Sequence, residues 1–139
     1  MAKSEKSGIK TAGKGIVIRE AHFPGRAPID AYGNGGFRFA DMSHRGSILC
    51  LPSGIYGWQP RGAVPALDEI RQILDEAEEI EILLVGTGET LQFLPEDVLA
   101  ALRARNIAVD SMSTGAAVRT FNVLLNEERA VAAALFAVD

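Results

Sequence analysis

The sequence contains little cysteine and histidine and has no long hydrophobic run. Its 139 residues include one cysteine, Cys50, and two histidines. A single cysteine excludes a disulfide framework and leaves a cysteine-based zinc site without support. Because no apolar run reaches the roughly 20 residues of a membrane-spanning helix, we expect a protein that is not transmembrane. Cys50 lies in an apolar stretch, so we interpret it as a small buried hydrophobic residue rather than a reactive thiol.

The N-terminal segment lacks the features of a targeting signal. Residues 1–14 contain lysines but no apolar segment like that of a secretory signal. They also lack the arginine-rich amphipathic pattern of a transit peptide. We therefore expect a cytoplasmic protein with a disordered basic leader over residues 1–14 and a single domain over residues 15–139.

Positive charge is scarce in the part of the chain that we expect to fold. Residues 1–26 hold six basic and two acidic residues, whereas residues 27–139 hold eight basic and sixteen acidic ones. An acidic domain is poorly suited to the phosphate backbone, so we expect no nucleic-acid partner. The basic leader could meet an anionic lipid surface or an acidic protein, although a solvated tail is the simpler interpretation.

Complete nucleotide-binding and metal-binding motifs are also absent. No P-loop sequence occurs, and Gly86-Thr87-Gly88 begins like a dinucleotide fingerprint but has Leu91 where the third glycine is required. The two histidines, His22 and His44, lie in separate predicted loops without a third ligand at a metal-binding spacing. We therefore expect no nucleotide, no other cofactor and no metal.

No catalytic constellation stands out either. A triad could be drawn from Ser113, His44 and Asp110, yet no G-x-S-x-G nucleophile elbow supports it. Asp110 lies in a predicted strand that we expect to be largely buried, either as a paired structural carboxylate or as a perturbed one facing a crevice. We name no catalytic residues. Because no catalytic constellation is supported, we favour a protein that is not an enzyme.

The patterns that are present divide the chain into a β-rich first half and a second half in which strands and helices alternate. Gly33-Asn34-Gly35-Gly36 is a strong turn signal between two short runs and predicts a hairpin. Apolar residues recur at helical spacing after Pro65 and Pro95. Other predicted elements are strands at 15–18, 46–51, 80–86 and 107–112, and a helix from about Thr114 to Leu125. Alternating strands and helices imply right-handed crossovers onto a largely parallel sheet, whereas residues 130–138 fit either a helix or a strand.

Two glycine-bearing turns are the best candidate for a ligand site. Each follows an apolar run, so two parallel strands would bring the turns together at the edge where open α/β sheets bind ligands. The helix after the second turn would supply free N–H groups and partial positive charge to a small anion. A structural alternative for Arg119 is a salt bridge to Glu89, Asp110 or the acidic helix. The candidate ligand-binding residues are Thr87, Gly88, Ser113, Thr114, Gly115 and Arg119.

Several segments together form a family pattern: Ile29-Asp30-Ala31-Tyr32-Gly33, Leu51-Pro52-Ser53-Gly54, Leu84-Val85-Gly86-Thr87-Gly88, Phe93-Leu94-Pro95, the signature 109–124 and the run 129–135. The pattern resembles the small Mth-like domain family over residues 15–138. The resemblance implies a three-layer α/β fold with a central, mixed and mostly parallel sheet flanked by helices, and an additional small β element from the N-terminal half. It also implies that residues 130–138 form a strand antiparallel to its neighbours.

The Mth-like family includes an adipogenesis-associated domain protein and the mitochondrial NADH:ubiquinone oxidoreductase (complex I) assembly factor 3. The resemblance therefore implies a non-enzymatic protein-interaction module, in the cytoplasm or peripheral at the inner membrane. Its partner would be a subunit or assembly factor of a membrane complex. This chain departs from the family pattern at Ser113-Thr114-Gly115, where many relatives have Asp-Thr-Ala, and at Val118, where cysteine is frequent.

Two alternatives remain open at this point. The first is a small-molecule or anion binder, or an enzyme, that uses the crevice between residues 86–90 and 113–119. The second is a homo-oligomer that pairs through exposed sheet edges or through the region around Trp58, whose ring fits either the core or an exposed aromatic patch. The oligomeric state is left open by the sequence.

Overall fold

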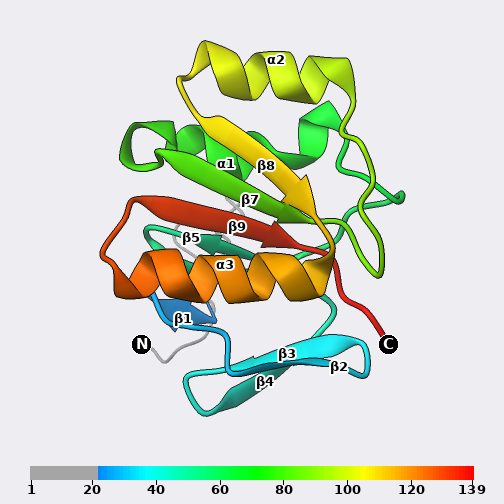
Figure 1. The fold of residues 1–139 in the computed structure, drawn as a ribbon, viewed down its shortest axis with the longest axis vertical. Coiled ribbons are helices and arrows are strands. Elements are labelled where there is room, and N and C mark those ends of the chain that lie inside the picture. The colour runs from blue at the N-terminus through cyan, green and yellow to red at the C-terminus, as the bar shows by residue number, and fades with distance from the viewer. Residues whose placement is uncertain (1–21) are drawn as a thin grey trace, which may run out of the picture.

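A computed structural model describes residues 22–139. The leader 1–14 and the predicted strand 15–18 lie outside the described residues. Six strands form one mixed sheet in the order β1-β6-β5-β9-β7-β8 (Figure 1). They are β1 (Phe23–Pro24), β5 (Ser47–Leu51), β6 (Gly54–Trp58), β7 (Ile82–Gly86), β8 (Ala108–Met112) and β9 (Val131–Leu135). This sheet, with helices on its faces, confirms the α/β fold class.

Parallel pairing is confined to the part of the sheet that the second half of the chain builds. Strand β7 pairs in parallel with β8 on one side and with β9 on the other. The β5–β9, β5–β6 and β1–β6 pairs are antiparallel, so the sheet is mixed as expected but not mostly parallel. The expectation that residues 130–138 run antiparallel to their neighbours is therefore wrong on one side, because the crossover through a helix returns the chain to the direction of β7.

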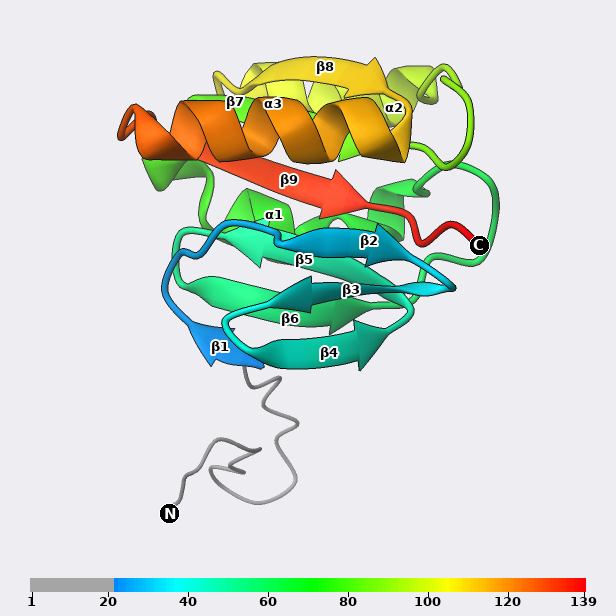
Figure 2. The same ribbon diagram turned by 60° about the horizontal axis from the view of Figure 1, so that its bottom comes forward.

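A second, three-stranded sheet comes from the N-terminal half and lies across β5 and β6 (Figure 2). It consists of β2 (Ala31–Gly33), β3 (Gly36–Phe39) and β4 (Met42–Arg45). The predicted hairpin is confirmed, since Gly33 pairs with Gly36 and the two turn residues between them have positive φ. The aromatic rings of Phe37 and Phe39 are buried, while Arg38 between them is exposed. The alternation leaves one face of this small sheet open to solvent.

Helix α3 (Thr114–Asn126) covers the face of the large sheet that also carries the small sheet (Figure 1). Its core side includes Ala117, Val118 and Phe121, which are buried. The opposite face is covered by α2 (Glu96–Ala104) and by the segment after Pro65. None of the helices in the described range 22–139 is long and apolar enough to cross a bilayer.

The acidic segment after Pro65 does not form the single helix that its spacing predicts. It divides into η1 (Leu67–Glu69), α1 (Arg71–Asp75) and η2 (Ala77–Glu79). Two carboxylates in it bind backbone outside their own turns: Glu69 accepts from Arg61 N at 2.8 Å, and Glu76 accepts from Ser53 N at 2.9 Å. These contacts attach the segment to the loop that contains Arg61 and to the turn that contains Ser53. The segment follows these two attachment points as a series of short turns.

Trp58 belongs to the core, as does Cys50. The Trp58 indole N–H donates to Glu69 O at 3.0 Å, and its ring meets Phe136 edge to face at 5.2 Å between centroids. Burial raises the pKa of the Cys50 thiol well above its ordinary value, which keeps the thiol protonated and unreactive. The interpretation of Cys50 as a buried residue is confirmed, and of the two alternatives for Trp58 the structure shows the core position.

Candidate functional site

The two glycine-bearing turns lie side by side at the carboxyl ends of β7 and β8, as the sequence predicts. The parallel ladder ends with Gly86 opposite Met112. Beyond it, Thr87 N donates to Met112 O at 2.9 Å, and Thr114 N donates to Gly88 O at 2.8 Å. The N–H of Gly88 in turn donates to Thr114 Oγ1 at 2.9 Å. The two turns are thus bonded directly to each other.

Three hydroxyl groups of the candidate set bind backbone. Thr114 has no exposed surface, and its Oγ1 donates to Phe136 O at 2.8 Å while it accepts from Gly88. Thr87 Oγ1 lies 2.9 Å from Thr90 O and accepts from Gln92 N at 2.9 Å. Ser113 caps α3 by accepting from Ala116 N at 3.3 Å. These hydroxyls hold the turns, the start of α3 and the segment after β7 in place.

Of the other members of the set, Gly115 is half-buried and Arg119 is exposed on α3. The Tyr32 hydroxyl packs so closely on Gly115 that a side chain there would collide with it. The Arg119 guanidinium lies 3.7 Å from the position that such a Cβ would take. Arg119 is exposed and forms no ion pair with a residue in the described range, so the salt bridge considered for it is not formed. Ligand binding by the six candidate residues stays a prediction.

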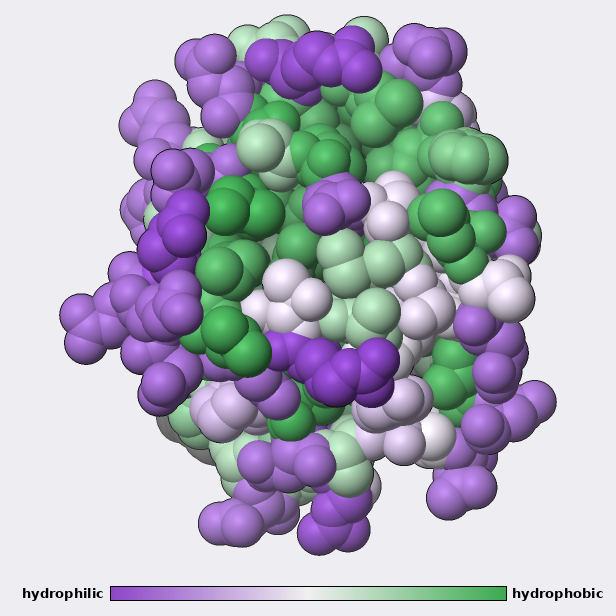
Figure 3. Space-filling view, viewed as in Figure 1, coloured by the Kyte–Doolittle hydropathy of each residue, from purple (hydrophilic) through white to green (hydrophobic). Residues whose placement is uncertain are grey.

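A surface feature that the sequence does not predict follows directly after the first turn. The loop 87–95 connects β7 to α2 and presents two apolar side chains to solvent, Leu91 at 48% and Phe93 at 87% exposure. Their neighbour Leu94 points into the core instead, at 8% exposure. Figure 3 shows hydrophobic groups emerging at the right of the molecule, where this loop runs. A possible signal was the apolar pair at positions 91 and 93 inside a predicted loop.

Several hydrogen bonds tie the ends of the loop 87–95 to neighbouring backbone. Thr87 fixes its first turn through the bonds to Thr90 and Gln92, and the pair of bonds between Gly88 and Thr114 anchors it to α3. At its far end, Pro95 precedes α2 and accepts from Leu99 N at 3.1 Å. The exposed Phe93 ring is therefore displayed by a loop that is pinned at both ends.

The two histidines, which the sequence places in separate predicted loops, lie side by side. Their ring centroids lie 4.6 Å apart, packed over Gly57. Burial, and secondarily the charge of His22, lowers the pKa of His44. Within residues 22–139 no group of three or more His, Cys, Asp or Glu side chains could hold a metal ion. Asp110 is exposed on the edge strand β8, so the expectation of a largely buried residue is wrong.

Comparison with known proteins gives a family and a fold. A family model described as "Protein of unknown function (DUF498/DUF598)" matches residues 29–136. NADH dehydrogenase (ubiquinone) 1 alpha subcomplex assembly factor 3 of Mus musculus is 34% identical over 121 residues, which cover 86% of this chain and 65% of that relative. This chain thus spans slightly under two thirds of the assembly factor.

Two solved structures have the same fold. One is the crystal structure of an outer membrane protein from Bartonella henselae, whose sequence is 66% identical to this chain. The match has a TM-score of 0.83 and covers 85% of this chain and 100% of that one. A Bordetella pertussis protein described as a Mth938-like domain is 26% identical, with a TM-score of 0.65 over 79% of this chain and 85% of its own. The match over residues 29–136 and the shared fold show that this chain belongs to the DUF498/DUF598 family of uncharacterised, Mth-like α/β domains.

Proposed function

We propose that the protein is a non-enzymatic interaction module that assists the assembly of a respiratory-type membrane complex, and that its partner docks on Leu91 and Phe93. The observation that carries the proposal is the Phe93 ring, 87% exposed on a loop pinned at both ends. Relationship to an assembly factor of NADH dehydrogenase supports this choice of partner.

The physical reason is the free energy available from an ordered aromatic anchor. Aromatic side chains, phenylalanine included, are enriched at protein interfaces, where a few residues dominate the binding energy. Because the loop 87–95 is held by Thr87 and Thr114, little conformational entropy remains to be lost on binding. Burial of the Phe93 and Leu91 side chains in a partner's apolar pocket would remove their nonpolar surface from water.

The same proposal includes a location. We place the protein in the cytoplasm and, while it acts on its partner, peripherally at the inner membrane. The described part of the chain has no helix able to span the bilayer, so contact with a membrane complex would run through that complex's exposed subunits or assembly factors.

Affinity capture of the full chain from its native cells tests the proposal. Wild-type protein is expected to recover a subunit or assembly factor of a membrane complex. Phe93→Ser should lose that partner, because a central aromatic anchor typically contributes about 2 kcal/mol or more to binding. Val123→Ser is the matched control, since Val123 is 55% exposed on α3 and lies outside the proposed surface. Equal recovery by wild type and Phe93→Ser would contradict the docking site.

An anion bound between the two turns is the alternative function. Arg119 supports it, because this exposed guanidinium lies near the N-terminus of α3 and has no carboxylate partner in the described range. A thermal-shift screen against phosphates, carboxylates and nucleotides discriminates the two functions. Stabilisation that disappears in Arg119→Gln would support the anion binder, and the absence of any stabilisation would exclude it.

A further inference from the structure

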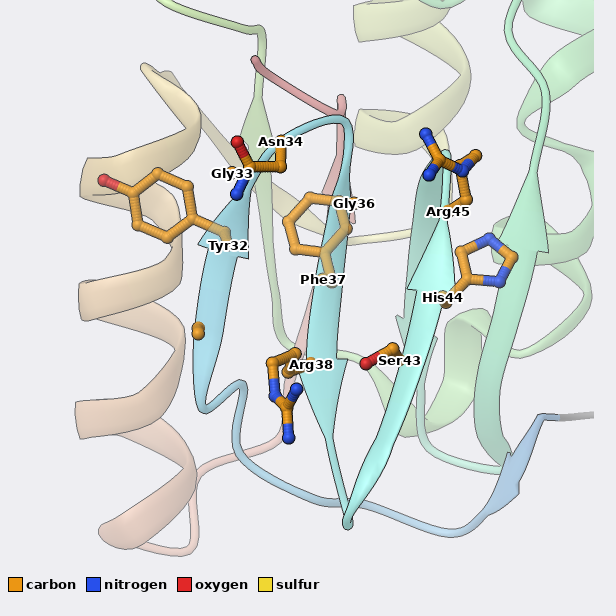
Figure 4. Close-up of a pocket in the computed structure, with 10 residues that line it drawn as sticks. Tyr32, Gly33, Asn34, Gly36, Phe37, Arg38, Ser43, His44 and Arg45 are labelled. Atoms are coloured by element: carbon orange, nitrogen blue, oxygen red, sulfur yellow. The ribbon is translucent and has the colours of Figure 1, made fainter.

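The solvent-facing side of the small sheet contains a hollow of about 400 Å³ that neither the two turns nor the loop 87–95 contribute to (Figure 4). Strand register defines its geometry: Ala31, Arg38 and Ser43 pair in one row across the three strands, and Gly33, Gly36 and Arg45 pair in the next. All six residues line the hollow. Its volume is within the usual range for small-molecule sites, roughly 300–1,000 Å³.

The floor of the hollow is formed by backbone and small side chains. Gly33 and Gly36 have no side chain, and Ala31 and Ser43 have short ones. Gly36 has no room for a larger residue, because a Cβ there would collide with the carbonyl oxygen of His44. The depression is therefore a consequence of the backbone path and would not be filled by a rotating side chain.

Two arginines stand at opposite ends of this floor. Arg38 and Arg45 lie on adjacent strands as diagonal neighbours. The Cα atoms of such neighbours are generally about 7–8 Å apart. Figure 4 shows their guanidinium groups extending from opposite corners of the face. Both are exposed, and neither forms an ion pair with a residue in the described range.

The chemistry of the lining favours a ligand rich in acceptor oxygens. The ten lining residues include no Asp or Glu, although the rest of the domain is acidic. Besides the two guanidinium groups, Ser43 and Asn34 add a hydroxyl and an amide. Guanidinium groups bind phosphate oxygens in a bidentate manner, and a site open to solvent needs several charges to overcome screening.

We propose that this face of the small sheet binds a small molecule that carries a diphosphate group, with Arg38 and Arg45 each holding one end of it. The ligand is a soluble one rather than a lipid headgroup or an acidic peptide. The proposal is independent of the docking surface at Leu91 and Phe93, so Phe93→Ser is expected to bind diphosphate as the wild type does.

The test is a titration of the full chain with inorganic pyrophosphate at constant ionic strength, followed by amide chemical shifts in NMR spectra. Saturable shifts are expected at residues of the hollow, with an affinity for pyrophosphate at least about tenfold weaker in Arg38→Gln or Arg45→Gln, since each removes a charge-assisted contact. Arg45→Lys keeps the charge but not the planar fork and should weaken binding to a lesser degree. Arg103→Gln, on the exposed end of α2, is the control and should bind unchanged.

Several outcomes would overturn the proposal. One is the absence of saturable shifts in the hollow, or shifts that persist with the same affinity in both glutamine variants. Another is malonate binding as tightly as pyrophosphate, which would contradict the phosphate class. A third is sedimentation with vesicles containing phosphatidic acid in the absence of pyrophosphate binding, which would point to a lipid. Dispersed amide spectra of each variant show that it is folded, so that lost binding reports on the arginine itself.

Discussion

The Thr114 hydroxyl acts both as a donor and as an acceptor in hydrogen bonds that stabilise the fold. It donates to Phe136 O and accepts from Gly88 N, and it thereby joins β9, α3 and the loop 87–95. Thr114→Val keeps the shape of the side chain but leaves the half-buried N–H of Gly88 and the half-buried carbonyl of Phe136 without this partner. We expect a loss of about 1–3 kcal/mol in the free energy of unfolding, measured with urea.

The control for Thr114→Val is Thr120→Val in the same helix. Thr120 is half-buried, and among the described residues its side chain makes no hydrogen bond. Its replacement should change the stability by less than about 0.5 kcal/mol. Equal effects of the two substitutions would show that the Thr114 hydroxyl does not hold the turns together.

His44 should make the stability of the fold depend on pH. Its burial and the neighbouring His22 lower its pKa in the folded state, whereas an unfolded histidine has a pKa of about 6.5. As the pH falls below about 6.5, the unfolded chain takes up the proton first, so stability is lost down to the lowered folded pKa. Urea unfolding at about pH 7.5 and pH 5.5 should show a larger loss for wild type than for His44→Gln. An identical loss would assign the pH dependence to other groups.

Residue-level expectations succeeded where a side chain has a local task. The buried Cys50, expected from the hydropathy of its stretch, is an example. The structure shows two further local tasks, the Ser113 cap and the left-handed Asn106 after α2, which depend on the adjacent backbone. The exposure of Asp110 was not predictable in this way. Asp110 is exposed because β8 lies at the edge of the sheet. That position is determined by the pairing of strands that are far apart in the sequence.

At the scale of elements, the contact between β7 and α3 depends on Gly86. A Cβ at this position would lie 2.8 Å from Thr114 Cα and 3.0 Å from Ala117 Cβ. Gly86→Ala should therefore push the start of α3 away from the sheet and destabilise the fold by about 1–3 kcal/mol in urea unfolding. Gly62→Ala is the control, because the nearest atom there is 3.9 Å away. An unchanged stability of Gly86→Ala would contradict the close approach.

Elements with strong local signals were predicted well, and elements shaped by distant contacts were not. The hairpin around Gly33–Gly36 has its turn chemistry in the sequence, and α3 has both a cap and an apolar stripe. The segment after Pro65 has a helical pattern too, yet carboxylates that bind Arg61 and Ser53 help to divide it into short turns. The direction of β9 relative to β7 likewise follows from topology rather than from residues 130–138.

At the scale of the whole molecule, the potential binding features lie on separate surfaces. The turns after β7 and β8 stabilise the carboxyl edge of the large sheet and display Leu91 and Phe93 beyond it. The hollow with Arg38 and Arg45 belongs to the open face of the small sheet (Figure 4). The juxtaposition of the two turns was predictable from parallel pairing. The outward position of Phe93 was not, because it depends on bonds between Thr87 and residues three and five positions later.

Site-specific photo-crosslinking in native cells tests the central claim most directly. A photoreactive phenylalanine analogue placed at Phe93 should crosslink to a subunit or assembly factor of a membrane complex. The same group at Val123, exposed on α3, serves as the control and should not. Both positions are exposed, so stability should change by less than about 0.5 kcal/mol in each variant. A crosslink from position 93 alone is the result we predict, and crosslinks to the same partner from position 123 but not from position 93 would contradict the proposed docking surface.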